Sequence, residues 1–407
     1  MSVQTAHSTV PDSGTNVTLK VITFVCFTFI AYLTIGLPLA VLPGYVHQDL
    51  GMGSVLAGLV ISVQYVATLM SRAMTGRLCD SKGAKKAVSL GLAMCLVSGL
   101  FYVGAGVFDS HSPIVAFAIL IVGRLIVGVG ESLVGTGSIQ WAVGAVGLGN
   151  TGKVISWNGV ATYGGLAAGA PLGVVLVRLA GFEALGVTVI VLAIAGLLLA
   201  WRQIPVPAVH GERLGIHHVF RRVVNYGLAL GLGSAGFGAI ATFITLYYAS
   251  HNWSGAAFAL TVFGVCFCGS RLMFVDTIGR FGGYKVAVVS MIAEAVGLAL
   301  LGFAPSSLLA LIGAGLAGTG FALVFPALGV VAVETVPLAD RGAALGLYSA
   351  FLDLALGVTG PVAGIVAHHF GFSAVYVGTA GVVLCGGGIV VGLWSKARQH
   401  AGTSMLG

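Results

Sequence analysis

Long apolar runs dominate the chain and are separated by short polar segments. In Val21–Leu42 and Ala374–Leu393, apolar and small residues follow one another without a polar alternation. A helix needs about 20 such residues to cross a bilayer, whereas membrane strands alternate apolar and polar positions over about 10 residues. Because backbone groups in lipid must bond within their own segment, the continuous runs predict membrane-spanning helices.

Twelve runs are long enough to span, and an even number places both chain ends on one side of the membrane. The pattern therefore predicts an all-α membrane protein. The predicted spans are Lys20–Leu42, Ser54–Thr75, Ala87–Phe108, Pro113–Val134, Ile155–Val177, Gly186–Trp201, Val223–Tyr248, Gly255–Phe274, Ala287–Phe303, Ser307–Val331, Ala344–Ala367 and Ala374–Leu393.

Basic residues gather in alternate connections between these spans. The connections on the opposite side contain a single basic residue, Arg178. Since positive charge favours the cytoplasmic side, both tails, residues 1–19 and 395–407, are expected in the cytoplasm. The basic residues of the predicted cytoplasmic connections are Arg77, Lys82, Lys85, Lys86, Lys153, Arg202, Arg213, Arg221, Arg222, Arg280, Lys285 and Arg341.

The longest of these connections, residues 202–222, falls near the midpoint and contains Pro205, Pro207 and Gly211. It predicts a cytoplasmic linker between two six-helix bundles, residues 20–201 and 223–394.

The two halves repeat each other. Ser71-Arg72-Ala73-Met74 in the second span matches Ser270-Arg271-Leu272-Met273 in the eighth, at an offset of 199 residues. A second set of matches has an offset of 190. Parallel repeats of this kind place a substrate path between the halves. The second set comprises Gly128/Gly318, Gly130/Gly320, Leu133/Leu323, Val134/Val324, Gly152/Gly342 and Pro171/Pro361.

Composition agrees with a multi-pass membrane protein. Of 407 residues, 57% are hydrophobic and 8% are charged, against about 25% charged in soluble domains. The net charge of +7 is explained by membrane orientation, so nucleic acid is not an expected partner. The six cysteines have no zinc-ligand spacing, no phosphate-binding loop is present, and neither an enzyme, a cofactor nor a metal is indicated.

The charged residues Arg124, Glu131, Asp353 and Glu294 lie inside apolar runs. A charge at the bilayer centre costs roughly 3 kcal/mol on insertion scales and usually faces a protein interior or a water-filled path. Arg124 and Glu131 are seven residues apart, so they share a helix face about 10 Å apart and can line one path. Alternatively, Arg124 is structural, bonded to neighbouring carbonyl groups, and Glu131 has a solvated role near the membrane surface.

Asp353 is the better of the two remaining acids for a place in a central cavity, and Glu294 is expected to pair with a polar neighbour. Together, Arg124, Glu131 and Asp353 are the candidates for proton coupling.

The segment after the second span resembles a signature of the major facilitator superfamily. The matching positions are a glycine, an acid four residues later, a second glycine and paired basic residues, although Ser81 replaces the usual basic residue after the acid. The resemblance implies a gating latch, with Asp80 meeting the start of the eleventh span near residues 341–342. The alternative is a loop that only orients the chain. The motif residues are Gly76, Arg77, Asp80, Gly83, Lys85 and Lys86.

Two further patterns resemble signatures of the same superfamily. Arg124 with Gly128 and Gly130 resembles a motif tied to proton transfer. The fifth span resembles the antiporter signature, although Ala170 separates its glycine from its proline; the alternative is a close-packed helix pair. The fifth-span residues are Gly165, Gly169, Pro171 and Gly173.

Three segments, residues 32–47, 155–159 and 236–246, look like the YhhS/YfcJ branch of bacterial inner-membrane permeases, which is commonly labelled arabinose-efflux-like. Arg72 and Arg271 are expected to extend toward the cytoplasmic surface from helix ends. Mid-span polar and aromatic residues suit a small solute that needs hydrogen bonds and stacking surfaces. These cavity candidates are Tyr32, Gln64, Tyr65, Trp157, Asn158, Tyr163 and Phe237.

The predicted function is secondary transport, with export of a small organic or drug-like solute in exchange for protons. Proton-coupled uptake of a sugar or organic acid is the alternative, and a non-transporting membrane sensor is a second one. The expected partners are the solute, protons and the lipid bilayer, and the expected setting is the bacterial inner membrane with a monomer as the working unit.

Overall fold

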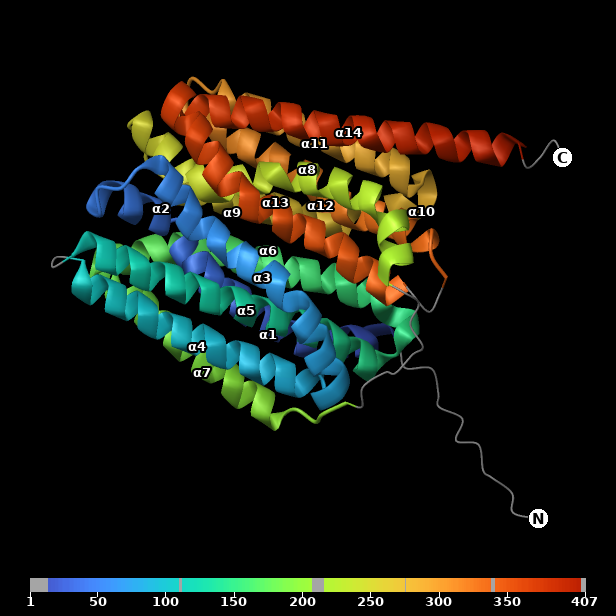
Figure 1. Ribbon diagram of the computed structural model, residues 1–407, viewed down its shortest axis with the longest axis horizontal. Coiled ribbons are helices and arrows are strands. Elements are labelled where there is room, and N and C mark those ends of the chain that lie inside the picture. The colour runs from blue at the N-terminus through green and yellow to red at the C-terminus, as the bar shows by residue number, and fades with distance from the viewer. Residues whose placement is uncertain (1–13, 110–111, 207–215, 275, 338–340, 404–407) are drawn as a thin grey trace, which may run out of the picture.

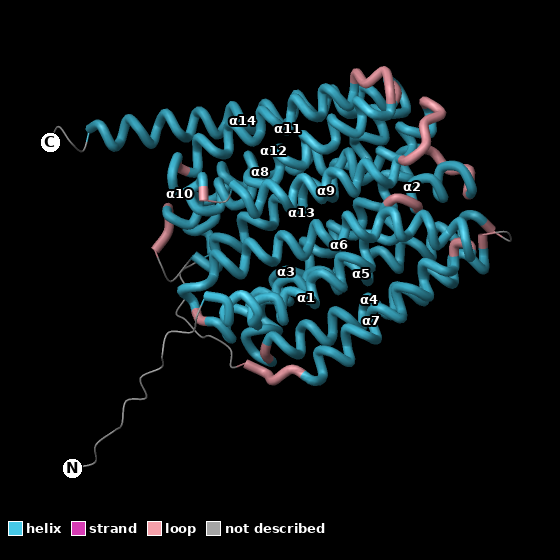
Figure 2. The backbone as a smooth tube through the Cα atoms, turned by 180° about the vertical axis from the view of Figure 1, so that it is seen from behind, coloured by secondary structure: helices cyan, strands magenta, loops and turns pink. Residues whose placement is uncertain are grey.

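The computed structural model describes residues 14–109, 112–206, 216–274, 276–337 and 341–403 (Figure 1). Helices account for nearly all of these residues, and no strand occurs among them. Of these helices, 12 are long and apolar enough to cross a membrane, which confirms the predicted fold class. Figure 2 shows the helices side by side, with the connecting loops at the two ends of the molecule.

The long helices are α1 (Gly14–Leu39), α3 (Ser54–Lys82), α4 (Ala84–Phe108), α5 (Pro113–Val146), α6 (Thr151–Ala180), α7 (Glu183–Arg202), α8 (Ile216–Ser250), α9 (Ala256–Phe274), α11 (Gly283–Gly302), α12 (Ser307–Glu334), α13 (Arg341–Phe370) and α14 (Phe372–Thr403). The short ones are α2 (Leu42–Gly44), η1 (Tyr45–Asp49), η2 (Leu148–Asn150) and α10 (Thr277–Phe281).

Most long helices extend beyond the apolar runs that predicted them. The motif after the second span was expected to be a loop, and that expectation is wrong, because α3 continues through Lys82 and α4 begins at Ala84. Gly83 alone connects them, with a φ of 85° that favours glycine. Lys85 Nζ donates to the carbonyl oxygens of Trp201 (3.0 Å) and Gln203 (2.6 Å), which fixes the end of α7.

The central connection is also shorter than predicted. Helix α8 begins at Ile216, so Arg221 and Arg222 belong to a helix, and residues 207–215 lie outside the described part of the chain. Likewise, α14 continues to Thr403 through much of the predicted tail (Figure 1). The latch between Asp80 and the start of α13 stays a prediction.

Glycines on α6 allow an unusually close approach to α1. A Cβ placed on Gly169 would lie 2.8 Å from Gly36 Cα, and one placed on Gly165 would lie 2.9 Å from Leu33 N. Gly173 meets the carbonyl oxygen of Leu37 in the same way. Small residues therefore bring these two helix backbones together. Packing accounts for the glycines of the predicted antiporter motif, and its meaning for transport stays a prediction.

Two seams join the bundle α1–α7 to the bundle α8–α14. In the first, α3 packs against α13, and Ser54 Oγ donates to the carbonyl oxygen of Gly364 at 3.0 Å. In the second, α6 packs against α9, and Thr261 Oγ1 donates to the carbonyl oxygen of Ala167 at 3.0 Å. Ser54 begins α3, and Thr261 lies near the beginning of α9 opposite the middle of α6, so both contacts lie toward the end of the molecule away from the chain termini. We call this end the distal end.

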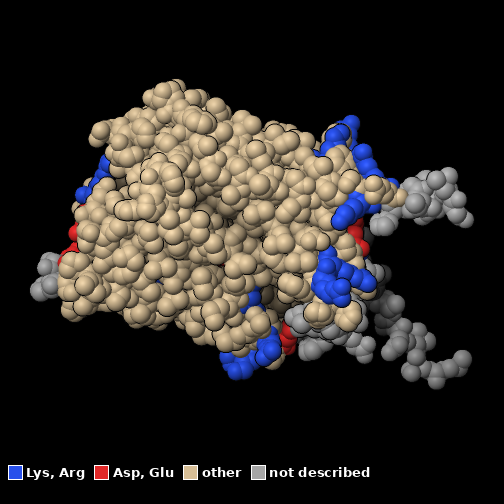
Figure 3. Space-filling model, turned by 45° about the horizontal axis from the view of Figure 1, so that its top comes forward, with Lys and Arg blue, Asp and Glu red and all other residues tan. Residues whose placement is uncertain are grey.

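The charged surface lies mainly at the ends of the molecule. In Figure 3, lysine and arginine gather mostly toward the end from which α14 projects, and the surface between the two ends is largely uncharged. Apolar side chains in the middle of their helices, such as Met70, Val191 and Val265, are strongly exposed. An apolar belt of this kind suits contact with lipid.

Candidate substrate cavity

A cavity of about 380 Å³ lies between the two bundles. Its walls come from α1, α3, α5 and α6 of the first bundle and from α8, α9, α12 and α13 of the second. Gln140 near the end of α5, Thr151 at the start of α6 and Gly346 near the start of α13 line it. These residues lie toward the end that carries the chain termini, so the cavity extends toward that end while the distal seams close the other.

Glu131 lies in the cavity wall and is 5% exposed. Its carboxylate accepts hydrogen bonds from Tyr32 Oη at 2.8 Å, Gln64 Nε2 at 2.6 Å and Thr68 Oγ1 at 3.1 Å. These neutral donors come from α1 and α3, so three helices of the first bundle meet at one acid. These bonds stabilise a carboxylate inside the membrane, and no cation among the described residues is bonded to it.

Asp353 on α13 forms an ion pair with Arg72 on α3, and it is 2% exposed. Arg72 Nε donates to Oδ2, and Arg72 Nη2 donates to Oδ1 at 2.9 Å. The pair is bidentate, which is the strong geometry for a guanidinium and a carboxylate. It also connects the two bundles across the cavity wall.

The expectation that Arg72 reaches the membrane surface is wrong. Because α3 continues to Lys82, Arg72 lies ten residues before the helix end, or about 15 Å along the axis. The same expectation is wrong for Arg271 on α9, which is 3% exposed and lines the cavity. Arg271 Nη1 donates to the carbonyl oxygen of Ala322 at 3.1 Å. The sequence carried one signal for both residues, the repeated Ser-Arg-x-Met segment.

Arg124 is fully buried but does not line this cavity. Its Nε donates to the carbonyl oxygen of Val60 at 3.0 Å, and its Nη1 donates to Tyr102 Oη at 3.2 Å. These contacts connect α5 to α3 and α4. They match the alternative of a structural arginine, and a role for Arg124 in proton coupling stays a prediction.

Five of the seven predicted cavity residues line the cavity, namely Tyr32, Tyr65, Asn158, Tyr163 and Phe237. Gln64 is fully buried behind Glu131, and Trp157 is half-buried outside the lining. Sequence reasoning did not select Thr68, Phe267 and Phe321, which also line it.

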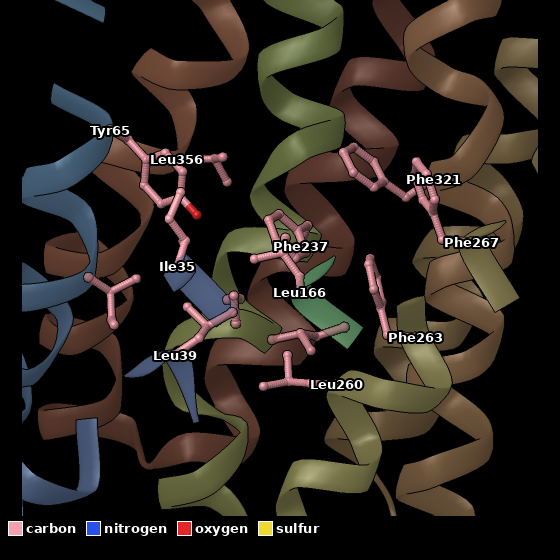
Figure 4. Packing of buried hydrophobic residues seen from close by; sticks show 14 of the residues in the cluster. Ile35, Leu39, Tyr65, Leu166, Phe237, Leu260, Phe263, Phe267, Phe321 and Leu356 are labelled. Carbon is pink, nitrogen blue, oxygen red and sulfur yellow. The ribbon is translucent and has the colours of Figure 1, made fainter. Parts of the chain in front are cut away.

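Aromatic rings form another part of the cavity wall. The rings of Phe237 and Phe321 stack with centroids 6.0 Å apart, and the centroids of Tyr163 and Phe267 are 3.8 Å apart. Figure 4 shows Phe321, Phe267 and Phe263 together on one side and Tyr65 on the other, with Phe237 between them. The cavity therefore has one polar wall and one aromatic wall, as a site for an amphipathic small molecule requires.

Glu294 on α11 is fully buried outside the cavity lining. The expectation of a polar partner is wrong, because neither carboxyl oxygen has a hydrogen-bond partner among the described residues. Gly236 and Gly320 approach it closely from α8 and α12.

The described part of the chain has 12 helices that can span a membrane, in two bundles with a cavity between them, and this arrangement defines a multi-pass membrane carrier. Comparison with known proteins gives the family: the model of the Major Facilitator Superfamily matches residues 24–279 and 227–404. The chain belongs to this superfamily, whose members are transporters and not enzymes.

The chain is 51% identical over 404 residues to an uncharacterized MFS-type transporter of Burkholderia mallei strain SAVP1, covering 99% of both chains. It is 52% identical over 384 residues to one of Pseudomonas aeruginosa strain UCBPP-PA14, covering 94% of this chain and 95% of the relative. Among solved structures, a partially occluded inward-open form of the Escherichia coli xylose transporter XylE superposes with a TM-score of 0.74 at 13% identity, over 93% of this chain and 98% of the other. That structural likeness concerns the fold.

Proposed function

We propose that this transporter exports a small organic solute in exchange for protons, by alternating access of the cavity to the two sides of the membrane. The observation that carries the proposal is Glu131. It is an acid in the cavity wall, it is bonded only to neutral side chains among the described residues, and it lies where solute and water can reach it. A group of this kind can gain and lose a proton as the cavity changes sides.

The Arg72–Asp353 pair supplies the conformational element of the proposal. It connects α3 and α13 from opposite bundles, so a rocking motion of the bundles changes its surroundings. The distal seams suit a state that is open toward the chain termini. In the proposed orientation both termini are cytoplasmic in the bacterial inner membrane, residues 203–215 between α7 and α8 form the linker, and one chain is the working unit.

Glu131→Gln is expected to lower gradient-driven solute flux at least tenfold, because the amide cannot carry a proton. The measurement uses proteoliposomes with the medium more acidic than the lumen, and a solute that stabilises the purified protein against heating. Solute exchange without a pH gradient should persist in the variant. Glu334→Gln, at an exposed position at the end of α12, is the matched control.

The direction of solute movement separates export from uptake. With acid outside, antiport expels solute from the lumen, whereas symport accumulates it. A wild-type solute flux that is the same with and without the pH gradient would contradict proton coupling.

A further inference from the structure

Arg72 and Arg271 are equivalent positions of the two halves. They are 199 residues apart within the repeated Ser-Arg-x-Met segment, and each lies on a helix that faces the opposite bundle. Arg72 on α3 faces α13, and Arg271 on α9 faces α6. A symmetric molecule would give both arginines the same kind of partner.

The partners differ. The offset of 190 that matches Pro171 to Pro361 in α6 and α13 also places Tyr163 at the position of Asp353. Arg72 therefore meets a carboxylate, and the equivalent position across from Arg271 is a neutral phenol. Arg72 thus forms a complete ion pair within the protein, whereas Arg271 has no carboxylate at the equivalent position.

The contacts of Arg271 agree with this difference. One hydrogen bond, from Nη1 to Ala322 O, is formed by its guanidinium, and the buried Nε has no partner among the described residues. On the α6 side, Gly159 lies against the guanidinium and has no side chain to bond it, and a Cβ added there would lie 3.1 Å from Arg271 Cζ. A buried guanidinium without a counter-ion is costly, so an anion from outside the protein would be bound favourably.

The surroundings of Arg271 fit the rest of such a ligand. Arg271 Cζ lies 5.8 Å from the centre of the Phe267 ring, and Phe237 and Phe321 line the cavity beyond it (Figure 4). The Tyr163 ring, which also lines the cavity, has its centre 3.8 Å from that of Phe267. Glu131, in the polar wall, repels an anionic group and favours its placement at Arg271.

We propose that Arg271 binds the anionic group, a carboxylate or sulfonate, of an organic-anion substrate whose aromatic or apolar body lies against Tyr163, Phe237 and Phe321. This inference rests on the proposed transport function for its biological role. Its test measures binding to the purified protein, so it is independent of proton coupling and of transport direction.

The probes are naphthalene-2-carboxylate and naphthalene-2-sulfonate, with the neutral naphthalene-2-carboxamide and the cationic 2-naphthylmethylammonium for comparison. Titration calorimetry on the detergent-solubilised full chain should show binding of at least one anion at least tenfold tighter than of the amide or the amine. Arg271→Gln should remove this preference, and Arg271→Lys should retain part of it. Arg280→Gln, at an exposed position on α10, is the matched control and should change nothing.

Gly159→Ala keeps the charge and crowds the guanidinium, so it should weaken anion binding even if Arg271→Gln fails to fold. Equal binding of amide and anion, tighter binding of the amine, or no binding of either anion to the wild-type protein would overturn the proposal. So would an anion preference that survives in a folded Arg271→Gln variant.

Discussion

Asp353→Asn alone is expected to destabilise the protein more than Asp353→Asn combined with Arg72→Gln. Removing one member of a buried ion pair leaves the other charge uncompensated, which typically costs about 3–5 kcal/mol. Because the Arg72 side chain is 29% exposed to the cavity, the lower end of that range, about 3 kcal/mol, is expected. Thermal unfolding of all four members of the double-mutant cycle measures the effect.

Solute flux should also be lowered more by Asp353→Asn alone than by Asp353→Asn combined with Arg72→Gln. Asp353→Asn is expected to lower flux at least tenfold, because an uncompensated Arg72 inside the cavity holds one conformation or attracts the wrong ligand. Lys396→Gln, at an exposed position on α14, is the charge-removal control. Additive stability effects of Asp353→Asn and Arg72→Gln would show that the pair does not couple the two bundles.

Joining the distal seam between α6 and α9 by a disulfide is expected to reduce solute flux to the level of empty liposomes. Ala167 and Thr261 touch across this seam, and both are replaced with cysteine. The six native cysteines are first replaced, because Cys268 Sγ lies on the same seam, 3.6 Å from the carbonyl oxygen of Val160. The disulfide prevents the bundles from separating there, so the cavity cannot open to the distal side.

Reduction of the disulfide should restore flux, and the two single-cysteine variants should transport normally under oxidising conditions. Unchanged flux in a fully cross-linked sample would mean that the seam need not open.

The sequence predicted the helices well because continuous apolar runs have one stable structure in lipid. The positions at which helices end were harder to predict. The charged segment after the second span was assigned to a loop, yet α3 continues through Lys82 because a helix can project beyond the apolar core once its side chains meet water.

That shift of a helix end explains why Arg72 was misplaced. A residue thought to lie close to a helix end lies about 15 Å before that end, and its partner Asp353 is 281 residues away in the chain. No local pattern carries such a pairing. The internal repeat did relate Arg72 to Arg271, and their different partners became visible only in three dimensions.

The sequence identified buried charged residues more reliably than it identified the roles of those residues. Glu131 and Arg124 were both selected because charge is rare in apolar runs, but Glu131 lines the cavity and Arg124 bonds to backbone carbonyls behind it. A helical wheel places both on one face and cannot tell which neighbouring helix covers each position.

Distances between spin labels at the two ends of the bundles test alternating access most directly. One label pair, at Arg77 on α3 and Arg280 on α10, spans the end that carries the termini. The other, at Leu179 on α6 and Phe370 on α13, spans the distal end, and all four positions are exposed. We expect a change of pH or added solute to shorten the first distance and lengthen the second in the same molecules. Distances that keep one distribution at both ends, or that change together in the same direction, would contradict it.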